Sequence, residues 1–130
     1  MLSRRSVLLA AVAASAAAVA PASAAGAQPF NDAAFAEAQK AGKPIFVAIH
    51  ASWCPICKAQ EPILAQLMTD PKFKDLAYFT IDFDSQKDLV RRFGARMQST
   101  LISFKGAAEQ GRSVGDTNRA SIAALLNKVL

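Results

Sequence analysis

Cys54 and Cys57 are the residues of this chain best suited to chemistry, and they are its only cysteines. Two residues separate them in the segment Trp53-Cys54-Pro55-Ile56-Cys57-Lys58. The apolar run Ile45 to Ile49 before the pair is typical of a buried strand, and the segment Gln60 to Met68 after it is typical of a helix. The sequence therefore places both thiols at a strand-to-helix turn.

The start of a helix can activate a thiol, because unpaired backbone N–H groups and the positive end of the helix dipole stabilise the thiolate that attacks disulfides. If Cys54 caps the helix, we expect it to be the nucleophile. Cys57, one turn further in, would then resolve a mixed disulfide by attacking the Cys54 sulfur. Pro55 suits the first helical position, where its missing N–H would have had no partner. The spacing predicts a reversible redox pair that needs no cofactor.

Two other uses of the cysteines compete with this interpretation. A structural disulfide across so short a loop would constrain the unfolded chain little. A metal site is the other, although two thiolates underfill a tetrahedral zinc site, which needs four ligands. His50, the single histidine, precedes Cys54 by four residues and would supply a third ligand for a soft or borderline metal. The alternative function is thus a copper-binding protein using Cys54, Cys57 and His50.

Residues 1–24 have the pattern of a signal peptide. Arg4 and Arg5 form a basic start, Val7 to Ala20 is alanine-rich and apolar, and Ala22-Ser23-Ala24 fits a small-residue cleavage site. The arginine pair also resembles a twin-arginine export signal, without the usual Phe and Lys after it. The apolar stretch is shorter than the roughly 20 residues of a spanning helix. We therefore expect a periplasmic or otherwise exported protein with no membrane span after cleavage.

Residues 25–130 remain as one small domain with a single core. Removing Arg4 and Arg5 leaves a net charge of +3 in place of the +5 of the whole chain. The basic residues are scattered, so we expect no nucleic acid partner. We also expect a monomer. An oxidising compartment allows disulfides to persist. The expected partners are protein disulfide or dithiol substrates and a redox partner that the sequence does not name.

The order of elements predicts the fold class. A helix capped by Asn31 runs to about Lys40, and a final helix is capped by Asn118. Between the cysteine helix and the final helix, the patterns predict a strand at Tyr78 to Phe83, a short helix at Gln86 to Phe93, a strand at Leu101 to Phe104, a hairpin loop at Gly106 to Gly111 and a strand at Arg112 to Val114. This α/β order predicts a central mixed β-sheet with helices on both faces and the cysteines at the carboxyl end of a central strand.

The chain resembles the thioredoxin family over nearly all of residues 25–130. The segments that carry the resemblance are Ala51 to Lys58, Pro62-Ile63-Leu64, Phe93 to Arg96, Thr100 to Lys105 and Val114-Gly115. The resemblance implies a thioredoxin fold and thiol–disulfide oxidoreductase activity on protein substrates. It also implies catalytic roles for Cys54 and Cys57, and substrate contacts from Trp53, Pro55, Gln98 and Ser99.

The chain departs from the family pattern in three places: at Ser99, at the pair Ala48 and Thr80, and at Pro55-Ile56, which replaces a Gly-Pro pair between the cysteines. Ser99 stands where the family has a cis-proline. We expect a trans peptide bond before Ser99, because a cis bond before a residue other than proline costs roughly 2.5 to 4 kcal/mol. The resemblance implies that losing this proline uncovers the sulfurs. Ala48 replaces the family's buried aspartate, and Thr80 stands where many members have a lysine that pairs with it. We therefore expect water or another group to carry the proton of Cys57, with slower turnover.

Overall fold

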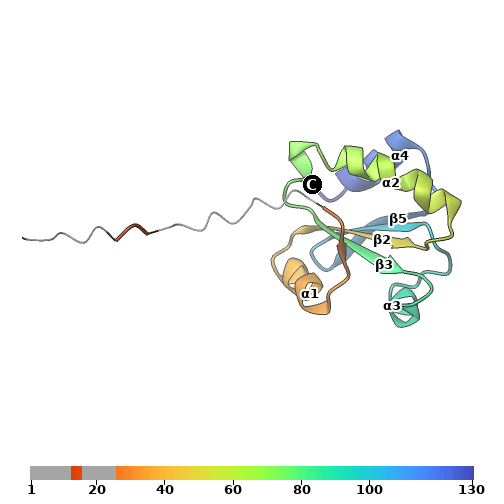
Figure 1. Cartoon of the computed structure of the whole chain (residues 1–130), viewed down its shortest axis with the longest axis horizontal. Coiled ribbons are helices and arrows are strands. Elements are labelled where there is room, and N and C mark those ends of the chain that lie inside the picture. The colour runs from red at the N-terminus through yellow and green to blue at the C-terminus, as the bar shows by residue number, and fades with distance from the viewer. Residues whose placement is uncertain (1–12, 16–25) are drawn as a thin grey trace, which may run out of the picture.

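A five-stranded mixed sheet crosses the centre of the molecule, with α1 and α3 on one face and α2 and α4 on the other (Figure 1). The computed structural model describes residues 13–15 and 26–130. Its elements along the chain are β1 (Gln28–Pro29), α1 (Asp32–Lys40), β2 (Pro44–His50), α2 (Pro55–Leu67), the 3-10 turn η1 (Pro71–Phe73), β3 (Ala77–Asp82), α3 (Lys87–Arg92), β4 (Thr100–Lys105), β5 (Ala108–Val114) and α4 (Arg119–Asn127).

The sheet has the order β1-β3-β2-β4-β5, with β2 at its centre. β2 pairs in parallel with β3 and antiparallel with β4, so the sheet is mixed. The predicted fold class is confirmed, and the cysteine pair follows the carboxyl end of the central strand. In an open sheet of this kind, reactive groups gather at that end of the strands.

The side chains of β2 fill both cores, because successive residues of a strand point to opposite faces. Phe46 and Ala48 belong to the cluster under α2 and α4, and Ile45, Val47 and Ile49 belong to the cluster under α1 and α3. Burying an apolar side chain of this size contributes about 1.5 to 3 kcal/mol. β2 is therefore firmly held, and it gives the cysteine turn a fixed support.

The predicted signal peptide at residues 1–24 lies outside the described residues, apart from residues 13–15. Its boundary with the domain, and the export that it implies, stay predictions. No helix within residues 13–15 and 26–130 is long and apolar enough to cross a membrane.

The predicted loop at Gly106 to Gly111 is wrong. β4 and β5 are joined by Gly106 and Ala107 alone, and Gly106 has the positive φ of 57° that a tight hairpin turn requires. Gly111 lies inside β5, opposite Ser103 and next to a bulge. A Cβ atom there would lie 3.0 Å from Leu125 Cδ1, so this glycine allows α4 to pack closely and does not form a turn.

Burial of Tyr78 makes the fold sensitive to alkali. Two causes raise the pKa of Tyr78 from 10.0 to about 12. The larger is the burial of the phenol away from water, and the smaller is the negative charge of Glu61. The unfolded chain releases this proton above pH 10 and the folded chain does not. The free energy of unfolding should therefore fall between pH 10 and 12, by up to about 1.4 kcal/mol per pH unit for this one proton.

Tyr78→Phe should reduce that loss, since phenylalanine has no proton to release. Urea unfolding of the reduced protein from pH 8 to 12 measures the effect, with wild type as the reference for all other titrating groups. If the free energy of unfolding fell equally steeply with pH in the two proteins above pH 10, the raised pKa of Tyr78 would be contradicted.

Candidate active site

Cys54 occupies the N-cap of α2, as the sequence predicts. Its backbone is extended, with φ of −83° and ψ of 112°, and its sulfur accepts a hydrogen bond from the backbone N–H of Cys57 at 3.1 Å. Pro55 follows within the first helical turn. The N–H group and the helix dipole both favour negative charge on the Cys54 sulfur. The turn after β2 therefore places one sulfur where a thiolate is stabilised.

Cys57 is suited to the opposite protonation state. The pKa of the Cys57 thiol is raised from 9.0 to about 11. Burial is the largest cause, and the hydrogen bond to the Cys54 side chain and the Cys54 charge add to it. A backbone hydrogen bond with Ala51, which has a larger effect than the Cys54 charge, and a smaller one with Ser99 lower this pKa. Cys57 therefore keeps its proton at neutral pH while lying within hydrogen-bond reach of Cys54.

Trp53 joins the cysteine turn to the loop after β3. Its side chain is 54% exposed, which fits the predicted contact with a substrate, and its indole N–H donates to Asp84 Oδ2 at 2.7 Å. The Asp82 carboxylate shapes the same loop by accepting from the backbone N–H and the hydroxyl of Ser85 and from the backbone N–H of Asp84, and these bonds lower its pKa. The sequence alone did not connect Asp84 with the site.

Ser99 borders the cysteine pair in an unusual conformation. No described peptide bond is cis, so the trans bond predicted here is confirmed, and Ser99 has a φ of 62°. A left-handed backbone costs about 1 to 3 kcal/mol in a residue with a side chain. The Ser99 N–H donates to Ile49 O at 2.8 Å, and its carbonyl accepts from Gly115 N–H at 3.1 Å. Ser99 is buried and Gln98 beside it is half-buried.

Comparison with known proteins assigns the family. The family model described as thioredoxin matches residues 26–128. The chain belongs to the thioredoxin family. Thioredoxin of Mycobacterium tuberculosis is 32% identical over 101 residues, which cover 77% of this chain and 86% of that protein. Thioredoxin Asp f 29 of Aspergillus fumigatus is 31% identical over 87 residues, covering 67% and 79% of the two chains.

Solved structures agree with this assignment. The crystal structure of Trxlp from Edwardsiella tarda EIB202 superposes with a TM-score of 0.75 at 40% identity, covering 78% of this chain and 98% of that one. Thioredoxin NaTrxh from Nicotiana alata gives a TM-score of 0.70 at 25% identity, covering 79% and 91%. The fold and the homologues indicate thiol–disulfide oxidoreductase activity, so this thioredoxin-family protein is an enzyme of that class.

The thiols of this thioredoxin-family protein are covered, contrary to the expectation drawn from Ser99. Cys54 is 0% exposed and Cys57 is 3% exposed. Cys54 and Cys57 form a buried cluster with Ala51, and Phe83 packs against this cluster. The expectation was wrong because it considered only the loss of proline. A substrate sulfur reaches Cys54 only when neighbouring side chains move.

Ala48 and Thr80 provide no proton relay beneath the cysteines. Ala48 is buried among apolar side chains of α2 and α4, and Thr80 is its partner on β3. The Thr80 hydroxyl donates to Gln28 O at 3.3 Å, at the edge of the sheet. Neither side chain titrates, so neither can carry the proton of Cys57. That this proton moves through water or another group stays a prediction.

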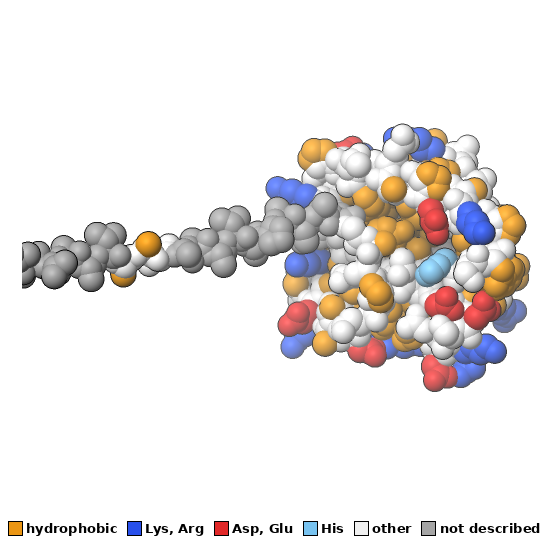
Figure 2. All heavy atoms as spheres, in the orientation of Figure 1, with side chains coloured by type: hydrophobic (Ala, Val, Ile, Leu, Met, Phe, Trp, Pro, Cys, Tyr) orange, Lys and Arg blue, Asp and Glu red, His pale blue; other side chains and the backbone are white. Residues whose placement is uncertain are grey.

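His50 does not join the cysteines in a ligand cluster. It is half-buried at the end of β2, opposite Asp82 in the register with β3. Figure 2 shows the single histidine side chain reaching the surface among acidic side chains. Within residues 13–15 and 26–130, no three His, Cys, Asp or Glu side chains gather closely enough to hold a metal ion. The copper alternative therefore gains no support from the geometry.

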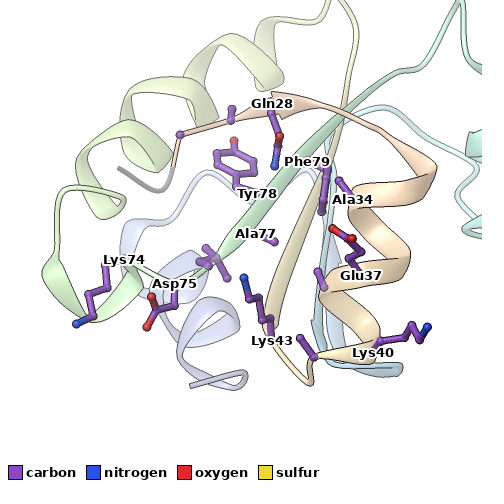
Figure 3. A pocket seen from close by; sticks show the side chains of 15 residues that line it. Gln28, Ala34, Glu37, Lys40, Lys43, Lys74, Asp75, Ala77, Tyr78 and Phe79 are labelled. Atoms are coloured by element: carbon purple, nitrogen blue, oxygen red, sulfur yellow. The ribbon is translucent and has the colours of Figure 1, made fainter. Parts of the chain in front are cut away.

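A separate pocket lies away from the cysteine turn, between α1, the start of β3 and the chain before β1 (Figure 3). Its volume is about 1000 Å³, and Lys40, Lys43 and Lys74 stand around it with Glu37 and Asp75. None of the predicted site residues lines it.

Proposed function

We propose that this protein is an exported reductase of protein disulfides, with Cys54 as its nucleophile and Cys57 as its resolving thiol. The observation that carries the assignment is the pair's geometry. Cys54 caps α2 with its sulfur on the Cys57 N–H at 3.1 Å, and the Cys57 thiol holds its proton with a pKa of about 11. Cys57 thus holds its proton, and it lies within hydrogen-bond reach of a sulfur that caps a helix.

The reaction takes place in two steps, an attack by Cys54 and a resolving attack by Cys57. The Cys54 thiolate attacks one sulfur of the substrate disulfide, which breaks the S–S bond, forms a mixed disulfide and releases the other substrate sulfur as a thiolate. Cys57 then loses its proton and attacks the Cys54 sulfur, which expels the second substrate thiolate. The substrate gains two electrons from the cysteine pair and two protons, one given up by Cys57 and one from the solvent, and Cys54 and Cys57 become a disulfide. An external dithiol must reduce that disulfide before the next turnover.

The surface around the cysteines is suited to a protein substrate. Trp53 and Ile56 are large exposed apolar side chains of the cysteine turn, and Met97 and Val114 are exposed apolar side chains of the segments that contain Ser99 and Gly115. Ile56 and Ser99 both approach Gly115, since a Cβ there would lie 3.9 Å from Ile56 Cδ1 and from Ser99 Oγ. An apolar surface around a reactive group typically marks a site of protein contact.

Export is supported by the N-terminal sequence, with its arginine pair, its alanine-rich stretch and its small residues at Ala22 to Ala24. We therefore place the reaction in the periplasm, where substrate disulfides persist.

Cys57→Ser in the full chain tests the substrates and the location together. Without its resolving thiol, the enzyme should stop after the first attack and accumulate as mixed disulfides with periplasmic proteins. Expression with residues 1–24 in a Gram-negative host, cell fractionation and non-reducing electrophoresis measure this. Cys54→Ser/Cys57→Ser is the matched control, because it lacks the attacking sulfur. Adducts confined to the cytoplasm would contradict export, and the absence of adducts would contradict disulfide exchange.

A further inference from the structure

Gln60 is a buried polar side chain on the helix that carries the cysteines. It lies on the inner face of α2, which also presents Cys57 and Leu64, and it is 3% exposed. A buried amide is unfavourable unless its polar atoms form hydrogen bonds. The partners of Gln60 therefore indicate why an amide occupies this position.

Both partners of the amide are backbone carbonyls. Gln60 Nε2 donates to Ser99 O at 3.3 Å and to Asp116 O at 2.9 Å. One side chain thus connects α2 with the segment before β4 and with the segment after β5. Only the NH₂ end of an amide can donate to two carbonyls, so these partners also fix the orientation of the Gln60 side chain.

The Ser99 carbonyl is the point where these bonds meet. It accepts from Gln60 and also from the Gly115 N–H at 3.1 Å. Together with the Ser99 N–H, which donates to Ile49 O at 2.8 Å, these bonds anchor a residue at a positive φ of 62°, which a residue with a side chain rarely adopts. Gln98 and Ser99 belong to the segment beside the cysteine pair, so the position of this carbonyl determines the course of the backbone that a bound substrate would meet.

We propose that Gln60 is a positioning residue for protein substrates: its amide holds the Ser99 carbonyl and thereby fixes the Gln98–Ser99 backbone beside Cys54. The proposal rests on the proposed function. Gln60 does not touch the reacting sulfurs, so its loss should weaken the binding of protein substrates and leave the thiol chemistry intact.

Gln60→Leu removes both hydrogen bonds at similar size. For reduction of a protein disulfide such as insulin, we expect kcat/KM to fall about 10-fold, mostly through KM, because two hydrogen bonds are lost. The rate with the small disulfide 5,5′-dithiobis(2-nitrobenzoate) should stay within about 2-fold of wild type. Gln66→Leu is the matched control, since it makes the same change at an exposed position of α2.

Two further variants separate positioning from a general loss of structure. Gln60→Glu keeps the shape, but its carboxylate cannot donate, so KM should rise at pH 8 and recover in part at pH 5, where a carboxyl that has gained a proton donates one of the two hydrogen bonds. Ser99→Gly should restore part of the lost affinity in the Gln60→Leu protein, because glycine adopts positive φ without strain. A structural defect elsewhere would give neither recovery.

Hydrogen exchange gives a readout that does not depend on activity. The Gly115 amide, which donates to the Ser99 carbonyl, should exchange about 10-fold faster in Gln60→Leu than in wild type or Gln66→Leu. Unchanged exchange, unchanged KM, or equal losses with protein and small disulfides would each overturn the proposal. Two results together would separate this proposal from the proposed function. If wild type reduced no protein disulfide, the proposed function would fail; if Gly115 exchange still rose in Gln60→Leu, Gln60 would still be shown to fix the position of the Ser99 carbonyl.

Discussion

Cys54→Ser should lower the rate of protein disulfide reduction at least about 10³-fold, to the level of the uncatalysed reaction, since catalysed rates usually exceed uncatalysed ones by 10⁶ or more. The serine hydroxyl does not ionise at the helix N-cap and cannot exchange with a disulfide. Turbidity from dithiothreitol-driven reduction of insulin measures the rate.

The matched control for this experiment is Cys57→Ser, which keeps the attacking sulfur and removes the resolving one. We expect one rapid attack per molecule from Cys57→Ser and none from Cys54→Ser. The two variants differ only in which sulfur remains, so the comparison separates the two roles. Turnover in Cys54→Ser comparable to wild type would assign the nucleophile elsewhere.

Local features of the site could be predicted because they depend on neighbouring residues. The N-cap at Cys54 needs only a strand end, a proline and a helical pattern within a few positions of the chain. The caps at Asn31 and Asn118 are local in the same sense, and the structure has both, with hydrogen bonds of 2.9 Å to the backbone N–H groups of Ala34 and Ser121.

Contacts between distant parts of the chain could not be predicted from spacing. Trp53 and Asp84 are 31 positions apart, and Gln60 and Ser99 are 39 apart, yet both pairs form hydrogen bonds. The covering of the sulfurs by Phe83 is of the same kind, because it depends on how the loop after β3 lies over the cysteine turn. No local pattern in the sequence carries that information. The two-residue strand β1 was missed because it is too short to show a period.

Glycine was the residue whose sequence signal misled most clearly. Gly106 and Gly111 look alike in the sequence, but Gly106 supplies a positive φ at a turn and Gly111 makes room for Leu125 of α4. The second role depends on packing between elements.

The Cys57 thiol should ionise about 100-fold less than an ordinary thiol at pH 8, because burial and the Cys54 side chain raise its pKa from 9.0 to about 11. Cys54→Ser removes the hydrogen bond and charge of Cys54 but leaves the burial, so Cys57 in that variant should titrate between 9.0 and about 11. Titration of cysteine ¹³Cβ chemical shifts in the reduced protein measures both values.

The folded and unfolded chains provide the decisive comparison for Cys57. In urea, both cysteines should titrate together as ordinary thiols, whereas in the folded protein the Cys57 signal should still be moving at pH 10. Alkylation offers a second check: the rate at Cys57 should rise about tenfold per pH unit past pH 9, since each unit adds tenfold more thiolate. An alkylation rate that levelled off near pH 9 would mean that Cys57 has an ordinary pKa and reacts slowly only because it is sterically covered. The assignment of Cys57 as the protonated, resolving thiol would then have no electrostatic basis.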